Sequence, residues 1–126
     1  MTTIAISSDT DVVTTINTFT VEPSRQRQVL DLLIGIATRV AAAAPGFLSA
    51  AFHTSADGTR IVTYAQFTSR DAVRVLEATI GEAIGHQAFS ALQETVTSDF
   101  HIYAVSAIVE GLDQSRYGLA RDYATK

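Results

Sequence analysis

The sequence lacks cysteine, so disulfides, thiolate metal sites and cysteine nucleophiles are excluded. It also lacks any cluster of lysine and arginine, and its net charge of −4 argues against a nucleic acid or an anionic membrane as partner. No segment approaches the ~20 apolar residues of a membrane span. Residues 1–15 lack the basic start and apolar run of a signal peptide. We therefore expect a cytoplasmic protein.

Sequence motifs for common cofactors and nucleophiles are missing as well. There is no GxxxxGK or GxGxxG segment, so nucleotide cofactors are not indicated, and no serine lies in a GxSxG elbow. The three histidines are not spaced three or four apart, nor do they share neighbouring positions on one strand face, so we expect no metal site. These absences argue against a nucleotide cofactor and against a histidine metal site.

What is present indicates one globular domain. The chain has 126 residues, of which 47% are hydrophobic and 17% charged, enough for a single core. Residues 1–11 are rich in Ser, Thr and Asp and read as a loose lead-in. We expect the domain to span residues 12–111. Residues 112–126 form either a short helix or an arm on a partner, and the sequence does not decide between them.

The central feature is the segment Pro45–Val73, which reads as two strands, a tight turn and the start of a helix. Asp57-Gly58 would supply the positive φ angles of a short hairpin between strands 47–55 and 60–67. Ser69 is a candidate helix cap, and Asp71 lies in the first turn, where the helix dipole favours an anion.

The remaining elements follow from apolar periodicity. An alternating strand is predicted over 12–21, and a helix over 24–44 that Pro45-Gly46 ends. Another helical region runs from 69 to about 97, with a break expected between 78 and 85 because of Gly81 and Gly85. A last strand is predicted over 100–109. The helix over 24–44 should bury one stripe of apolar side chains, namely Val29, Leu32, Leu33, Ile36 and Val40.

This order, βαββαβ, predicts an α+β fold of the ferredoxin-like, split βαβ type. Four antiparallel strands carry two helices on one face. The other face would be apolar and bare, and a second copy of the chain is the simplest cover, which gives a homodimeric α+β barrel. The residues expected on the bare face are Ile16, Leu48, Ala50, Phe52, Val62, Tyr64, Ile102 and Ala104.

Within this frame, the hairpin segment PGFLSAAFHTSADGTRIVTYAQFTSRDAV resembles the antibiotic biosynthesis monooxygenase family of dimeric α+β barrels. The segments INTFTVEPSRQRQVLDLL and FHIYAV resemble it too, and the run Asp57–Ser69 is the most specific part. The resemblance implies a cofactor-free oxygenase that converts polycyclic aromatic polyketides to quinones. In such enzymes the substrate is the reductant, so the site needs an apolar pocket, donors for an enolate oxygen and a proton acceptor.

The resemblance assigns site residues by position. Asn17 matches an asparagine on the family's first strand, and Thr63 and Phe67 stand where the hairpin has Asn and Trp. Val73 stands at a helix position that is Tyr in some members. Phe19 shares a strand face with Asn17, and Ala65 shares one with Thr63. Both therefore join Phe67 and Val73 as candidate substrate-binding residues.

The histidines add candidates for the proton acceptor. His53 and His101 fall on predicted strands, on the same side as Phe47 and Tyr103, and alternation predicts that both face the helices. Either imidazole, with an unperturbed pKa near ~6.5, would suit a general base; the alternative is an ordinary histidine at the rim.

His86 is a further candidate for contact with substrate and the one histidine placed to be an axial haem ligand. Haem-degrading relatives, however, place that ligand earlier on the helix, near Leu76 and Glu77 in this chain. The resemblance therefore implies no haem, and the pocket is expected to hold an aromatic small molecule alone.

Two classes of function follow. In the first, the chain is a cofactor-independent monooxygenase in which Asn17 and Thr63 bind the enolate and Phe67 stacks on the ring. In the second, it has kept the pocket but is a ring-closing or rearrangement enzyme, or a non-catalytic ligand-binding dimer. Thr63 favours the second class, because its hydroxyl cannot reproduce the two N–H donors of an amide. Phe67 favours it too, because it lacks the indole donor. Asn17 and the close match of the hairpin segment favour the first class, and the resemblance as a whole implies the monooxygenase.

Overall fold

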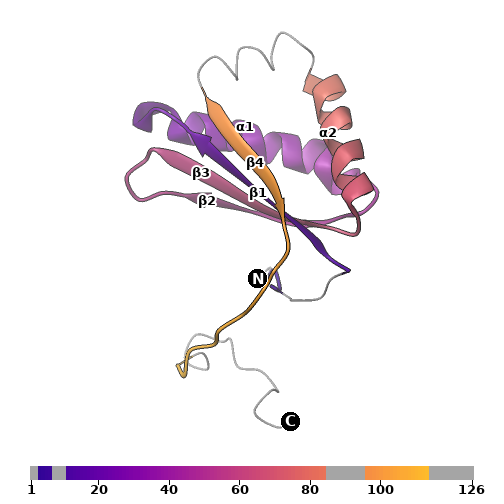
Figure 1. Ribbon diagram of the computed structural model, residues 1–126. Helices are drawn as coiled ribbons and strands as arrows, with labels where there is room; N and C mark the ends of the chain where they lie inside the picture. The colour runs from indigo at the N-terminus through magenta and orange to yellow at the C-terminus, as the bar shows by residue number, and fades with distance from the viewer. Residues whose placement is uncertain (1–2, 7–10, 85–95, 114–126) are drawn as a thin grey trace.

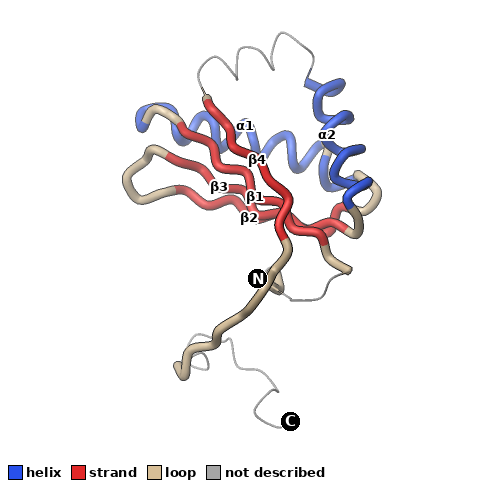
Figure 2. The backbone as a smooth tube through the Cα atoms, in the orientation of Figure 1, coloured by secondary structure: helices blue, strands red, loops and turns tan. Residues whose placement is uncertain are grey.

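The structure is a computed structural model that describes residues 3–6, 11–84 and 96–113 (Figure 1). Its strands form one antiparallel sheet in the order β2-β3-β1-β4. Both helices lie on the same side of this sheet (Figure 2). The ferredoxin-like βαββαβ prediction is therefore confirmed. The elements are β1 (Val13–Thr20), α1 (Gln26–Arg39), β2 (Phe47–Thr54), β3 (Arg60–Phe67), α2 (Arg70–Ile84) and β4 (Thr97–Tyr103).

Helix α1 is shorter than predicted because short 3-10 turns flank it, at Pro23–Arg25 and Ala41–Ala43. The predicted apolar stripe was wrong at one position. Leu30 is buried, whereas Leu32 is 43% exposed. The buried stripe therefore lies slightly to one side of the predicted one and still packs α1 onto the sheet.

The β2–β3 turn has a different basis from the predicted pair of positive φ angles. Among the described residues, Gly46 and Gly58 have positive φ, and no other residue type does. Asp57 instead uses its carboxylate, whose Oδ1 accepts hydrogen bonds from the Thr59 N–H at 3.0 Å and from the hydroxyls of Thr59 and Ser55 at 2.7 and 2.8 Å. These bonds lower the pKa of Asp57 to about 2, the Thr59 hydroxyl having the largest effect.

The same turn is tied to the start of α1. Gln26 Nε2 donates to the carbonyl oxygens of Arg60 at 2.9 Å and Ser55 at 3.3 Å. A Cβ added to Gly58 would lie 3.3 Å from Pro23 Cβ. The hairpin and the entry to α1 thus form one cross-linked unit.

A β-bulge at Leu48 changes which side chains of β2 face the helices. Phe47 pairs with Phe67, but the next pair is Ser49 with Gln66, so the register shifts by one residue. Beyond the bulge, Ala50 and Phe52 lie on the helix side. The prediction that these two residues lie on the bare face was wrong, because simple alternation does not allow for the extra residue.

The last two elements also differ from prediction. Helix α2 runs to Ile84 through Gly81 without a break, and the rest of the helical region predicted up to about residue 97, with Gly85, lies outside the described residues as far as residue 95. Its capping prediction is confirmed, because Ser69 Oγ accepts the Ala72 N–H at 3.1 Å. Strand β4 begins at Thr97, three residues before the predicted start, and ends at Tyr103.

The core lies between the sheet and the helices. One group of buried residues gathers around Phe67, Val73 and Leu76, and another around Ile61 and Val29. Ile61 is fully buried. Nothing in the described part of the chain is a helix long and apolar enough to cross a membrane.

The open face of the sheet is more polar than predicted. Ile102 pairs with Thr15, on the helix side of β1, so it does not belong to the open face. Gln66 lies on the open face. Its Nε2 donates to the carbonyl oxygen of Ala5 at 2.6 Å, so residues 3–6 contact one end of this face. The face is formed by Thr14, Ile16 and Thr18, by Ser49, Ala51 and His53, by Val62, Tyr64 and Gln66, and by Asp99, His101 and Tyr103.

Candidate functional site

A cavity of about 450 Å³ lies between the sheet and the two helices. Its floor is formed by β1, β3 and β4, and its walls by α1 and α2. Such a volume suits a small-molecule ligand. The lining residues are Asn17, Phe19, Leu33, Ile36, Phe67, Val73, Leu76, Glu77, Ile80, Ser98 and Phe100.

Asn17 is the amide in this lining, as the sequence predicted. It lies at the centre of β1, paired with Thr63 on one side and Phe100 on the other. Among the described residues, its Oδ1 is the buried side-chain polar atom with no hydrogen-bond partner. Leaving such an atom unpaired costs about 1–3 kcal/mol, so the position favours a ligand that hydrogen-bonds to the amide.

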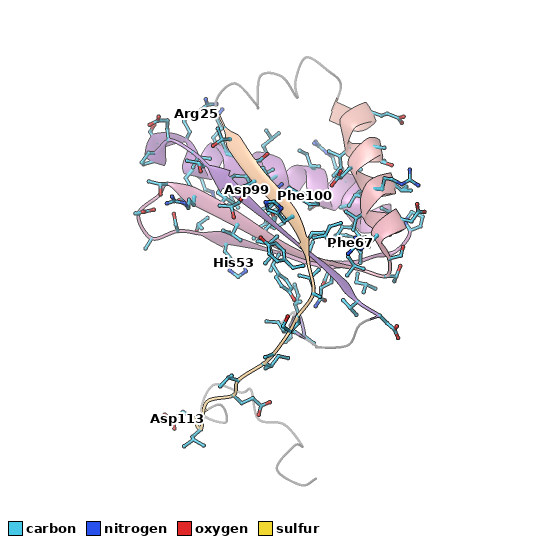
Figure 3. All side chains as sticks on the ribbon, in the orientation of Figure 1. Arg25, His53, Phe67, Asp99, Phe100 and Asp113 are labelled. Atoms are coloured by element: carbon cyan, nitrogen blue, oxygen red, sulfur yellow. The ribbon has the colours of Figure 1, made fainter. Side chains whose placement is uncertain are left out.

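Three aromatic rings give the cavity flat apolar surfaces. Phe67 is 4% exposed and packs edge-on against Phe47, with ring centroids 5.6 Å apart. Phe19 and Phe100 come from the neighbouring strands β1 and β4. Figure 3 shows Phe67 near the foot of α2 and Phe100 on β4. Phe19, Phe67 and Val73 are among the lining residues, and their contact with a substrate stays a prediction.

Thr63 and Ala65 lie beside the cavity but not in its lining. The Thr63 hydroxyl donates to the main-chain oxygen of Asn17 at 3.4 Å, so it is directed at β1. Ala65 is buried in the core with Phe67. The structure therefore places these two residues behind the site.

The expectation that His53 and His101 face the helices was wrong. His53 pairs with Val62 and His101 with Ile16, and all four lie on the open face. Figure 3 shows His53 projecting from the sheet on the side away from the helices. The bulge at Leu48 reverses the alternation for His53, and the register of β4 places His101 opposite Ile16. Neither imidazole lines the cavity.

His101 has other neighbours on that face. Its Nε2 lies 2.7 Å from Asp99 Oδ1, and its ring meets the Tyr103 ring edge-on. His86 lies outside the described residues. Within the described part of the chain, no group of three or more potential ligands could hold a metal ion.

Sequence reasoning missed several lining residues, and three of them, Leu76, Glu77 and Ile80, have a recognisable signal. On α2, Val73, Leu76, Glu77 and Ile80 follow the i, i+3, i+4, i+7 spacing of one helix face, so the pattern itself points to the site. Ser98 gave no signal, because it was assigned to a turn. Leu33 and Ile36 were predicted as core of the first helix, and they also form the cavity wall.

The family model described as antibiotic biosynthesis monooxygenase matches residues 12–79 of the chain. A tetracenomycin-F1 monooxygenase from Streptomyces glaucescens is 40% identical over 73 residues, which span 58% of this chain and 65% of that protein. The matched region thus covers slightly less than two thirds of the relative.

Solved structures are similar over most of the chain. SnoaB, a cofactor-independent oxygenase from Streptomyces nogalater, is 25% identical with a TM-score of 0.59, covering 80% of this chain and 99% of that one. The ActVA-Orf6 monooxygenase of Streptomyces coelicolor, solved in complex with nanaomycin D, is 28% identical with a TM-score of 0.58, covering 78% and 92%.

Proposed function

The chain belongs to the antibiotic biosynthesis monooxygenase family, and we propose that it oxidises a flat aromatic, polyketide-type small molecule with dioxygen and without a bound cofactor. The observation that carries this proposal is the aromatic cavity with Asn17 on its floor, whose side-chain Oδ1 is buried without a hydrogen-bond partner. The similarity to a tetracenomycin-F1 monooxygenase and to a cofactor-independent oxygenase supports the same reaction class.

The overall reaction converts an acidic methylene of the ring system to a carbonyl: CH₂ plus O₂ gives C=O plus H₂O. Removal of a proton gives an enolate, which supplies the electrons to dioxygen. The Nδ2–H of Asn17 would donate to the enolate oxygen, because that is where negative charge develops. The unpartnered Oδ1 of the same amide would accept a hydrogen bond from a hydroxyl of the substrate. The phenyl rings of Phe19, Phe67 and Phe100 would hold the substrate by stacking and exclude water.

The test is dioxygen uptake by the purified, metal-free protein with a panel of anthrones and hydroxynaphthalenes. We expect uptake, and we expect Asn17→Ala to lower its rate by about 10²-fold, the cost of one such donor. Thr18→Ala is the matched control, since Thr18 is the next residue on β1 and lies on the open face. Absence of uptake by the wild-type protein, or equal rates in both variants, would contradict the proposal.

A second candidate function is a ring-closing or rearrangement enzyme, or a ligand-binding protein, that uses the same cavity. The bond from the Thr63 hydroxyl to the Asn17 main chain favours it, because the hairpin offers the cavity no amide donor at this position. If oxygen chemistry has been lost in this way, Thr63→Asn combined with Phe67→Trp should raise dioxygen consumption. Saturable binding of an anthrone without dioxygen uptake would select this alternative.

We also propose that two copies pair through the open face as a homodimer. Ile16, Val62 and Tyr64 lie at the centre of this face and are only half-buried in one chain. An apolar centre that includes an aromatic residue, with a polar rim, is typical of interfaces between subunits. Sedimentation at low micromolar concentration should show a dimer, and a monomer would overturn the proposal. The cytoplasmic location stays a prediction.

A further inference from the structure

The cavity-facing stripe of α2 contains one residue that does not suit an apolar wall. Val73 and Leu76 are 3% and 6% exposed, and Ile80 is half-buried one turn further on. Glu77, the remaining member of the same stripe, lies directly after Leu76 and is exposed. Its carboxylate therefore belongs to the rim of the cavity, where it keeps contact with water while it borders the apolar interior.

Glu77 has distinctive chemistry at this site. Among the described lining residues it is the one that carries a titratable group, since Asn17 and Ser98 are neutral and the other eight are apolar. Of the described ion pairs, the one on α2 joins Arg74 to Asp71 and leaves Glu77 out. A carboxylate at the edge of an apolar cavity, not committed to a neighbouring cation, is available to a bound molecule.

The placement of the neutral groups completes the arrangement. Asn17 and Ser98 belong to the sheet floor, on adjacent strands, with Ser98 paired to Phe19 two residues along β1. Glu77 belongs to the helix wall above that floor. A flat ligand between them has hydrogen-bond groups on one side and an acceptor for protons on the other.

We propose that Glu77 is the proton acceptor that generates the enolate in this cavity. This inference rests on the proposed function and fills a role for which the sequence offered only His53 and His101, both now on the open face. In the first step, a Glu77 carboxylate oxygen takes the proton from the substrate methylene. The C–H electron pair moves into the ring system, and the Asn17 amide binds the resulting enolate oxygen.

The later steps balance without another co-reactant. The enolate carbon transfers an electron to dioxygen, and the two radicals combine to form a C–O bond in a peroxide anion. The Glu77 carboxylic acid returns its proton to that anion. Loss of the second C–H proton then breaks the O–O bond, and the departing hydroxide combines with a proton to give water. The methylene is oxidised to a carbonyl, and dioxygen is the sole oxidant.

Proton abstraction can be measured without oxygen, which separates this inference from the oxygenase proposal. Anthrone is incubated anaerobically with the protein in deuterium oxide buffer, and loss of its methylene signal is followed by proton NMR. We expect the wild-type protein to accelerate exchange and Glu77→Gln to lower the acceleration by roughly 10²-fold or more, as for loss of a general base. Binding of anthrone, measured by fluorescence, should be retained.

Two controls sharpen the result. Glu82→Gln removes a carboxylate from the same helix outside the cavity lining, and it should exchange anthrone at the wild-type rate. In Glu77→Ala, added formate should restore part of the exchange, because a small carboxylate fits the space that the side chain leaves. A merely structural role for Glu77 would not be rescued in this way.

Three outcomes would overturn the inference: no acceleration of exchange by the wild-type protein, equal exchange in Glu77→Gln and wild type, or loss of anthrone binding together with exchange. Dioxygen uptake is measured separately. Exchange that depends on Glu77 without uptake of dioxygen would support the role of Glu77 and refute the oxygenase. Uptake that persists in Glu77→Gln would support the oxygenase and refute the role of Glu77.

Discussion

The two edge strands of the sheet, β2 and β4, differ in how much of the fold covers them. Side chains of β2 such as Ala50 and Phe52 pack against the buried core, and the turn that follows is cross-linked to α1 through Gln26. Every residue of β4 is exposed, including Phe100 at 37% and Ile102 at 38% on its helix side.

This difference separates stability from function along the sheet. The half of the sheet that contains β2 and β3, the covered half, packs against the buried core and stabilises the fold. Strand β4, the exposed half, supplies Ser98 and Phe100 to the cavity and buries little surface in a single chain. Elements with few buried contacts are those from which ligand sites and moving parts are drawn. Substitutions placed on each half of the sheet test this difference.

The largest effect is expected in the covered half. Ile61→Ala removes the fully buried side chain of β3 and leaves a cavity beside Val21 and Val29. We expect the free energy of unfolding to fall by about 2–5 kcal/mol, measured by urea denaturation. Ile102→Ala on β4 is the control and should cost less than half as much. Equal losses at both positions would remove the proposed difference between the strands.

The next effect concerns the turn between the 3-10 segment and β2. Gly46 has φ of +82°, and an added Cβ would lie 2.6 Å from Ala72 Cβ and 2.8 Å from Thr68 Oγ1. Gly46→Ala should therefore lower the free energy of unfolding by roughly 1–3 kcal/mol. Gly81→Ala, where nothing lies within 4 Å of the new Cβ, should instead raise it by up to ~1 kcal/mol. Stabilisation by both substitutions would show that the contacts at Gly46 are not tight.

On the exposed half, a substitution should affect the ligand more than the fold. Phe100→Ala removes an aromatic wall of the cavity from a strand that is largely uncovered. We expect anthrone affinity to fall by about three- to tenfold, which corresponds to an aromatic contact of 0.5–1.5 kcal/mol. Fluorescence titration measures the affinity, and denaturation in parallel measures stability. A large loss of stability with unchanged affinity would place Phe100 in the core instead.

The smallest effect is expected from pH at the β2–β3 turn. The pKa of Asp57 falls from 3.8 to about 2 because the folded turn donates hydrogen bonds to the charged carboxylate. The stability from this group is therefore present above pH 3.8 and is lost as the pH falls through 2. An NMR titration of the Asp57 carboxyl carbon should give the lowered value. Asp57→Asn should reduce the loss of unfolding free energy that the wild-type protein shows as the pH falls from 3.8 to about 2. An unchanged loss would contradict the assignment.

The parts of the fold that the sequence predicted correctly are those controlled by local chemistry. Alternation identified β1 and the two hairpin strands, and Ser69 marked the start of α2. Asn17 and Phe67 were placed in the site through the family resemblance, and the cavity lining includes both. These features depend on residues close together in sequence or on a strongly matching segment.

The parts that were predicted wrongly depend on partners far away in the chain. No local pattern marks the bulge at Leu48, because its position is set by pairing with β3. The start of β4 is likewise set by pairing with β1, so the face of His101 could not be read from its own strand. Glu77 was visible as a charge within an apolar helical stripe, but only the cavity gives that charge a role.

The bulge at Leu48 also matters for comparing this chain with its relatives. An alignment that runs through β2 without a gap assumes that aligned side chains face the same side of the sheet, although one added or missing residue exchanges Ala50 and Phe52 for Ala51 and His53 on the helix side. A relative that lacks the extra residue would then be credited with the wrong buried side chains on β2, while its percentage identity hardly changed. Gap placement at a single position therefore decides which substitutions on β2 are interpreted as changes of the core and which as changes of the open face.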